Sequence, residues 1–238
     1  MCFKKEKDGN APCYGVAAAA EKPKGILTGK TVIFLGSSVT QGSAAKDESF
    51  VDFLQKQNGL IAVKEAVPGT TLADLKDSSY ISRLKRMEFA GKADAFVCQL
   101  STNDARKDIS LGEIAGGTDL CDFDTATVAG AIEYIIAYAR ERFGCPVVFY
   151  TGTRYDSPRY GEMVALLLQI AEKWHITVLD LWNDEAYLSV DPADYAFYMA
   201  DGVHPKRAGY GLWWTPAFEA CLTALFREKE AANENNIE

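Results

Sequence analysis

Histidine is scarce in this 238-residue chain, which contains only 2. The 6 cysteines are scattered, and no CxxC pair indicates a zinc or redox site. Because the sequence offers no cluster of His and Cys to hold a metal ion, we expect neither a metal nor another cofactor. Reduced, unpaired thiols are the simplest interpretation of these cysteines, and they favour a cytoplasmic location.

Long apolar runs and an excess of positive charge are missing as well. No apolar run approaches the ~18–20 residues that a membrane span requires, and the apolar stretch at residues 15–20 is too short for an export signal. The net charge of −8, from 25 basic and 33 acidic residues, disfavours binding to nucleic acid or to an anionic membrane. An acidic enzyme or small-ligand protein remains, with no nucleic acid and no membrane as partner.

The composition predicts one folded domain with a short extension at each end. Hydrophobic residues make up 48% and charged residues 24%, which are ordinary globular values. A domain usually has ~100–200 residues, so this length suggests one large domain. Residues 1–29 lack a sustained period and are expected to form an N-terminal arm, and residues 228–238 a C-terminal tail. Residues 30–227 form the expected domain.

Short apolar runs alternate with segments of helical periodicity along this domain. The runs are rich in Val, Ile and Phe, which is typical of strands buried on both faces of a parallel sheet. The predicted strands are residues 31–35, 61–66, 93–100, 146–151 and 177–181. Apolar stripes at residues 128–139 and 163–174 predict helices, the first with Asp124 or Thr125 as its N-cap, and a last helix follows Pro205.

Strands that alternate with helices imply βαβ units and therefore a parallel sheet. The predicted fold class is α/β: a three-layer α/β/α sandwich on a doubly wound, flavodoxin-like, five-stranded parallel sheet. Ligands bind to such sheets at the carboxyl ends of the strands. Small and polar residues follow the first four predicted strands, at residues 36–42, 67–71, 101–104 and 152–155. We expect these four segments to meet at one edge of the sheet.

A serine acts as a nucleophile only where a base takes its proton and donors receive the oxyanion. Of the two histidines, His175 ends a predicted helix, where a cation suits the helix dipole. His204 follows Asp201 by three residues, so this carboxylate is placed to accept the Nδ1 proton and leave Nε2 free as a base. A lone D-x-x-H is a weak signal. Taken alone, Ser37 and Ser38 are better explained as caps of the helix after the first strand. A phosphate-binding loop is the other alternative, although the lysine of a P-loop is missing.

Four segments taken together resemble, in the same order, the sequence blocks of the SGNH hydrolases, also called the GDSL esterase/lipase family. The segments are Gly36-Ser37-Ser38-Val39-Thr40-Gln41-Gly42, Val67-Pro68-Gly69, Ser101-Thr102-Asn103-Asp104 and Asp201-Gly202-Val203-His204-Pro205. The resemblance implies that Ser38 is the nucleophile, His204 the base and Asp201 the acid that orients it. It also implies an oxyanion hole made by the N–H groups of Ser38 and Gly69 and the side-chain amide of Asn103.

The chain departs from the family pattern at three places. Ser37 stands where the family has an Asp, and Ala66 and Val67 stand where an Asn often precedes the glycine. Ser101 replaces the glycine of G-x-N-D, so the backbone there is not expected to need a positive φ. None of these changes removes a group that contacts the reacting carbonyl. They bear on the substrate class more than on the reaction type.

The resemblance implies a carboxylic ester hydrolase that works through an acyl-enzyme without a cofactor. We expect a small-molecule ester as the substrate, with a short acyl group, acetyl, on a carbohydrate-like or other small alcohol. Ser37, Arg154 and Tyr155 are the expected substrate contacts at the rim of the site.

Alternatives within the same fold are an acyl thioesterase or lysophospholipase and an acyltransferase. A different class is a non-catalytic, flavodoxin-like module that binds a phosphorylated ligand at the turn after the first strand. The sequence leaves the oligomeric state open, a homo-oligomer included.

Overall fold

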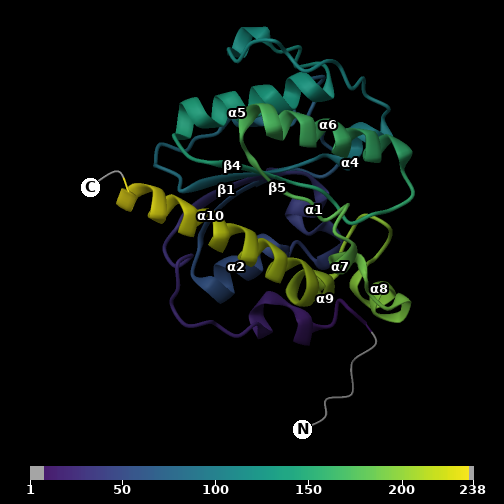
Figure 1. Ribbon diagram of the computed structural model, residues 1–238. Coiled ribbons are helices and arrows are strands. Elements are labelled where there is room, and N and C mark those ends of the chain that lie inside the picture. Colours follow the sequence, from purple (N-terminus) through teal and green to yellow (C-terminus); the bar gives the residue numbers. More distant parts are fainter. Residues whose placement is uncertain (1–7, 236–238) are drawn as a thin grey trace.

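The computed structural model describes residues 8–235, and within them five parallel strands form one sheet (Figure 1). The strands are β1 (Thr31–Gly36), β2 (Ile61–Ala66), β3 (Ala95–Gln99), β4 (Val147–Tyr150) and β5 (Thr177–Leu179). Their order is β2-β1-β3-β4-β5, and every pairing is parallel. This is the flavodoxin-like order, with a switch point between β1 and β3 where ligands bind in such sheets. The predicted fold is confirmed.

Helices cover both faces of the sheet (Figure 1). One layer contains α3 (Tyr80–Arg86), α4 (Thr102–Arg106), α5 (Val128–Phe143) and α6 (Pro158–Trp174). The other contains α2 (Phe50–Asn58) and α10 (Thr215–Asn235), the latter preceded by α9 (Arg207–Gly209) and the π-helix η5 (Tyr210–Trp214). The shorter elements are η1 (Pro12–Tyr14), η2 (Val16–Ala18), α1 (Ser38–Gln41), η3 (Ser43–Ala45), η4 (Leu120–Asp122), α7 (Glu185–Leu188) and α8 (Pro192–Tyr198).

Alternate residues of the central strands enter two separate cores. In β1, Ile33 and Leu35 pack in the core beneath α3, α5 and α6, while Val32 and Phe34 pack in the core against α2 and α10. Successive side chains of a strand point to opposite faces, so a strand covered on both faces needs a continuous apolar run. The prediction that all five strands are buried on both faces is wrong for β2 and β5, which are half-buried because they are the edge strands.

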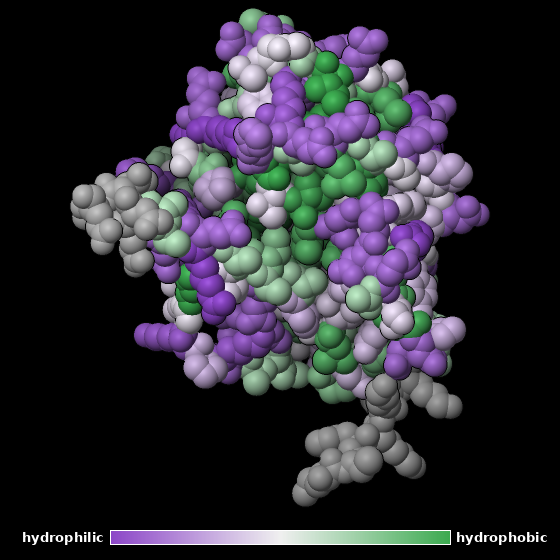
Figure 2. Space-filling model, viewed as in Figure 1, coloured by the Kyte–Doolittle hydropathy of each residue, from purple (hydrophilic) through white to green (hydrophobic). Residues whose placement is uncertain are grey.

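Hydrophobic side chains gather between α6 and α10 on the face seen in Figure 2, where β5 ends the sheet. Deeper in the same layer, the rings of Phe50 and Phe218 stack with centroids 3.7 Å apart, and Tyr150 meets Phe218 edge to face at 4.9 Å. These aromatic contacts join α10 to α2 and to β4, on the face of the sheet that α2 and α10 cover.

The ends of the long helices follow local capping chemistry. The N-cap of α5 is Thr127, whose Oγ1 accepts the N–H of Gly130 at 3.2 Å. The predicted caps, Asp124 and Thr125, are wrong because Asp124 forms the preceding turn, in which its side chain accepts the N–H of Ala126. His175 ends α6 as a C-cap in the left-handed conformation, with φ 48°. It is exposed and belongs to the end of a helix, not to the strand ends.

The segment of residues 8–29 lies against the domain. Gly9 accepts the N–H of Ala208 at 2.8 Å, and Val16 donates its N–H to Glu48 at 2.9 Å. Residues 1–7 of the expected arm and 236–238 of the expected tail lie outside the described residues, and α10 continues to Asn235. Over the described part of the chain, no helix combines the length and apolarity needed to cross a membrane.

Candidate active site

The turn after β1 places Ser38 at the start of α1. Ser38 is largely buried, with 8% of its surface exposed. The turn has no room for a side chain at Gly36, where a Cβ would lie 1.7 Å from Oγ1 of Thr40. Gln99, at the end of the neighbouring strand β3, accepts hydrogen bonds from the Ser37 N–H at 2.9 Å and from the Thr40 hydroxyl at 2.9 Å. A buried amide oxygen therefore fixes the conformation that precedes the nucleophile.

Three side chains form a continuous chain of hydrogen bonds. Oγ of Ser38 lies 2.9 Å from Nε2 of His204, and Nδ1 of His204 lies 2.8 Å from Oδ2 of Asp201. An ionised carboxylate can only accept, so Nδ1 carries the hydrogen and Nε2 is free to take the serine proton. This arrangement has the geometry of a Ser-His-Asp triad.

Asp201 is held in place by the backbone of its own loop. Its Oδ1 accepts the N–H groups of Val203 at 2.7 Å and of His204 at 2.8 Å. Partial burial raises the pKa of Asp201, but the hydrogen bonds from Val203 and from His204 together outweigh it, and the net pKa is below the ordinary value. Asp201 is therefore an anion when the imidazole becomes charged, and it stabilises that charge.

Asn103 lies beside the triad at the start of α4. Its Nδ2 donates to the carbonyl oxygen of Thr70 at 3.0 Å and to Oγ of Ser37 at 3.3 Å, so its amide is oriented by both neighbouring loops. Gly69, directly before Thr70, has a left-handed φ of 76°, and its carbonyl oxygen accepts from Nζ of Lys107 at 3.1 Å. The structure thus places the three donors of the expected oxyanion hole on adjacent segments that bond to one another.

Asp104 anchors the segment that follows Gly69. It is fully buried, and its carboxylate accepts the N–H groups of Leu72 at 2.9 Å and Ala73 at 3.1 Å. Burial raises the pKa of Asp104, although these N–H donors and the Ser101 hydroxyl oppose the shift. Ser101 itself caps α4 with φ −75°, so no glycine is needed there.

A cavity of about 290 Å³ opens over the reacting groups. Ser38, Asn103 and His204 line it together with Arg106, Tyr155 and Asp156, among others. A larger hollow of about 610 Å³ lies between α2 and the segment of residues 21–28, and none of the triad residues lines it. Among residues 8–235, no three His, Cys, Asp or Glu side chains gather closely enough to hold a metal ion.

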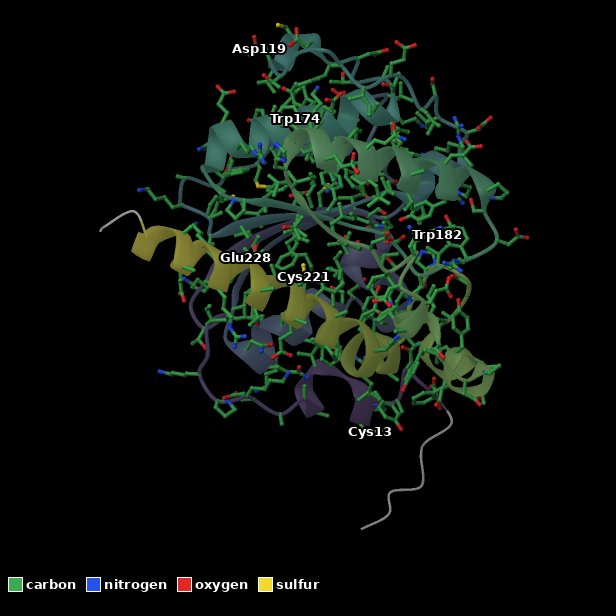
Figure 3. The ribbon with its side chains drawn as sticks, viewed as in Figure 1. Cys13, Asp119, Trp174, Trp182, Cys221 and Glu228 are labelled. Atoms are coloured by element: carbon green, nitrogen blue, oxygen red, sulfur yellow. The ribbon has the colours of Figure 1, made fainter. Side chains whose placement is uncertain are left out.

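The three residues expected to contact substrate have different surroundings. Tyr155 lines the cavity and packs edge to face against Trp182, with ring centroids 5.5 Å apart. Trp182 follows β5 in the chain and is labelled in Figure 3. Arg154 is absent from the lining, because its guanidinium pairs with Glu185 at 2.8 Å and donates to the carbonyl of Trp182 at 3.1 Å. Ser37 is fully buried, and its hydroxyl contacts Gln99 and Asn103 beneath the cavity instead of facing it.

The sequence reasoning missed several residues of this site. Gln99 is the one polar side chain in the apolar run at residues 95–100, and that isolated polarity was the available signal. Arg106 follows Asn103 by three residues, a spacing that places both on one face of a helix. Asp156 and Ser157 also line the cavity, and no motif marks them in the sequence.

Comparisons with known proteins identify one family. Residues 34–212, well over half of the chain, match the model of the GDSL-like Lipase/Acylhydrolase family. No curated protein shows a significant match.

Among solved structures, a protein from Lactobacillus plantarum is 20% identical, with a TM-score of 0.66 and coverage of 83% of this chain and 98% of that one. A member of the lipolytic protein G-D-S-L family from Veillonella parvula is 17% identical, with a TM-score of 0.56 and coverage of 80% and 97%. The acetyl xylan esterase AlAXEase is 16% identical, with a TM-score of 0.56 and coverage of 80% and 98%. These likenesses show a shared fold.

Proposed function

The chain belongs to the GDSL-like lipase/acylhydrolase family and is a hydrolase, and we propose that it removes short acyl groups, acetyl above all, from a carbohydrate-like or other small alcohol. The observation that carries the proposal is the chain of contacts from Ser38 through His204 to Asp201, at 2.9 and 2.8 Å. Membership of a hydrolase family also removes the alternative of a non-catalytic phosphate-binding module.

In the first half of the proposed reaction, Oγ of Ser38 attacks the ester carbonyl while Nε2 of His204 takes the hydroxyl proton. Asp201 stabilises the imidazolium that results. The oxyanion of the tetrahedral intermediate accepts hydrogen bonds from the N–H groups of Ser38 and Gly69 and from Nδ2 of Asn103. For this, one of the two N–H groups of Asn103 exchanges Oγ of Ser37, its acceptor at 3.3 Å, for the oxyanion. His204 then donates its proton to the departing alkoxide, which leaves as the alcohol, and Ser38 carries the acyl group.

In the second half, water enters the cavity and His204 removes one of its protons. The hydroxide attacks the acyl carbonyl through the same oxyanion hole. The second tetrahedral intermediate collapses, the proton passes from His204 to Oγ of Ser38, and the carboxylic acid leaves. No redox step or external group is needed for the atoms and charges to balance.

The size of the cavity supports a short acyl group. Its volume of about 290 Å³ lies just below the ~300–1,000 Å³ usual for small-molecule sites. Tyr155 lines the cavity and is supported by its edge-to-face contact with Trp182, and an aromatic ring at this position suits the apolar face of a sugar. The structural likeness to an acetyl xylan esterase points to the same substrate class.

The test is hydrolysis of p-nitrophenyl esters from acetate to palmitate, alongside acetylated xylose and glucose, with Ser38→Ala as the blank. We expect kcat/KM to fall steadily as the acyl chain lengthens beyond butyrate. A maximum at octanoate or longer contradicts the proposal and favours a lysophospholipase or acyl thioesterase. Transfer of acetyl to an added sugar in preference to water would identify an acyltransferase.

A further inference from the structure

Arg83, on α3, is a buried cation that the proposed reaction does not use, since only 7% of it is exposed. All of its N–H donors have acceptors. Nε donates to the carbonyl of Ser78 at 3.1 Å, and Nη1 donates to the carbonyl of Glu65 at 3.1 Å and to its carboxylate at 2.9 Å. Nη2 donates to the carbonyl of Gly36 at 2.8 Å and to Oγ1 of Thr70 at 3.2 Å. A guanidinium has five N–H donors, and these five contacts use them all.

The acceptors of Nη2 belong to the two segments that carry the backbone donors of the oxyanion hole. Gly36 is the last residue of β1, two positions before Ser38, and Thr70 directly follows Gly69. The N–H groups of Ser38 and Gly69 come from different loops, which one backbone hydrogen bond also joins, from the Val67 N–H to the Gly36 carbonyl at 3.2 Å. Nη2 of Arg83 contacts both loops at once.

The opposite side of the Gly69 loop is held by α4. Asn103 donates to the Thr70 carbonyl at 3.0 Å, and Lys107 donates to the Gly69 carbonyl at 3.1 Å. Asn103 also donates to Oγ of Ser37 at 3.3 Å, but neither Asn103 nor Lys107 is found to bond to the carbonyl of Gly36. Among the described residues, Arg83 alone is found to donate hydrogen bonds both to the Gly36 carbonyl and to the Thr70 side chain.

We propose that Arg83 is a positioning residue, which sets the spacing between the Ser38 and Gly69 N–H groups and thereby shapes the oxyanion hole. The inference rests on the proposed esterase function. Oxyanion donors act through preorganisation, and a site must hold its groups to within about 0.5 Å. A planar, five-donor guanidinium suits this task, whereas the ammonium of a lysine has three donors around one point. The central guanidinium carbon of Arg83 also lies over the ring of Tyr80, 5.2 Å from its centroid, in a cation–π contact.

The test compares Arg83→Lys with wild type and with Arg86→Met. Arg86 is the matched control because it is an exposed arginine one turn along the same helix, bonded to the carbonyl of Asp77. For Arg83→Lys we expect kcat for p-nitrophenyl acetate to fall about 10- to 100-fold while KM stays within about threefold, since misplacement by 1 Å can cost about 10²-fold. Affinity for a boronic acid, a tetrahedral mimic of the intermediate, should fall by the same factor. Arg86→Met should match wild type.

A purely structural role would lower the amount of active enzyme without changing these constants per titrated active site. Thr70→Val and Thr70→Ser keep the inference testable if the Arg83 variant does not fold. The valine removes the Oγ1 that Arg83 binds, so kcat should fall at least fivefold, and the serine should recover most of that loss. Unchanged kcat in both Arg83→Lys and Thr70→Val, or unchanged boronic acid affinity with reduced kcat, would overturn the inference. Failure of the proposed function itself would be seen separately, as a wild-type enzyme that hydrolyses no ester.

Discussion

The hydroxyl of Ser38 and the Nε2 atom of His204 lie 2.9 Å apart, although 166 residues separate them in the chain. Ser38 is placed by the end of β1, and His204 by the loop before α9. Tyr210, in the π-helix η5, connects the two regions because its buried hydroxyl donates to the carbonyl of Val39 at 2.6 Å. An irregular helical turn of this kind is common next to functional sites.

Removing either partner of this contact should abolish most of the activity. For Ser38→Ala and His204→Ala we expect kcat to fall by several orders of magnitude, on the order of 10⁴–10⁶, because the two act as one unit. The double variant should be scarcely worse than either single one. Steady-state kinetics with p-nitrophenyl acetate measures this, and a Ser38→Ala enzyme with more than a tenth of wild-type kcat would contradict it.

Loss of a donor from the oxyanion hole should lower kcat and leave KM nearly unchanged. Asn103→Ala removes a donor that is oriented by Thr70 and Ser37, and we expect kcat to fall about 10²–10³-fold with little change in KM. Asn103→Asp should be at least as impaired, because a carboxylate repels the developing negative charge. A change confined to KM would show that Asn103 binds the ground state instead.

The pH dependence of stability follows from Asp201. Its pKa is lowered in the folded protein from an ordinary value of 3.8. A carboxyl group with a lowered folded pKa stabilises the protein above its unfolded pKa, and this contribution is lost as pH falls through the folded pKa. Urea unfolding of wild type and Asp201→Asn should therefore differ above about pH 4 and converge in stronger acid. A difference that grows on acidification would contradict this sign.

The same variant tests the triad in catalysis. Asp201→Asn keeps the shape of the side chain but removes the charge that stabilises the imidazolium. We expect kcat to fall about 10²–10⁴-fold. Steady-state kinetics with p-nitrophenyl acetate measures this, and an Asp201→Asn enzyme with the kcat of wild type would contradict the role of Asp201 in the triad.

Two neighbouring residues provide a matched test of the cavity wall. Tyr155 lines the cavity, whereas Arg154 pairs with Glu185 outside it. We expect Tyr155→Ala to raise KM for acetylated xylose at least threefold, since an aromatic contact is lost. Arg154→Gln should leave KM within about twofold. The reverse order of effects would show that substrate approaches from the Arg154 side.

The aromatic core beneath α10 should dominate stability without touching catalysis. Phe218 is buried and stacks on Phe50 at 3.7 Å. Phe218→Ala should lower the free energy of unfolding by about 3–5 kcal/mol, and Phe218→Leu by much less, because the cavity left behind is smaller. Urea unfolding checks this, and kcat per folded molecule should stay at the wild-type level for both variants.

Features encoded in local sequence could be predicted. The central strands are continuous apolar runs because both faces of the sheet are covered, and the polar segments that follow β1 and β3 bring Ser38 and Asn103 to one edge. The roles of Asp201 and His204 came from the resemblance to the family, because a lone D-x-x-H is a weak signal. Their contact is local, since the two residues are three positions apart.

Features that depend on distant contacts could not be predicted. Gln99 bonds to Ser37 across 62 residues, and Arg83 bonds to Gly36 across 47, so neither role leaves a local pattern. The N-cap of α5 was missed for a similar reason, since Asp124 and Thr127 are both good caps and only the turn geometry decides between them. The pairing of Arg154 with Glu185 joins two segments that lie 31 residues apart, so no sequence pattern indicated this partner.

Covalent labelling with a fluorophosphonate, followed by peptide mass spectrometry, tests the central claim most directly, because the reagent needs a serine that is activated by a base. The account predicts modification at Ser38, loss of all ester hydrolysis in the labelled protein, and no labelling in Ser38→Ala or His204→Ala. Labelling at another serine, or an unlabelled Ser38 in a protein that hydrolyses esters, would contradict it.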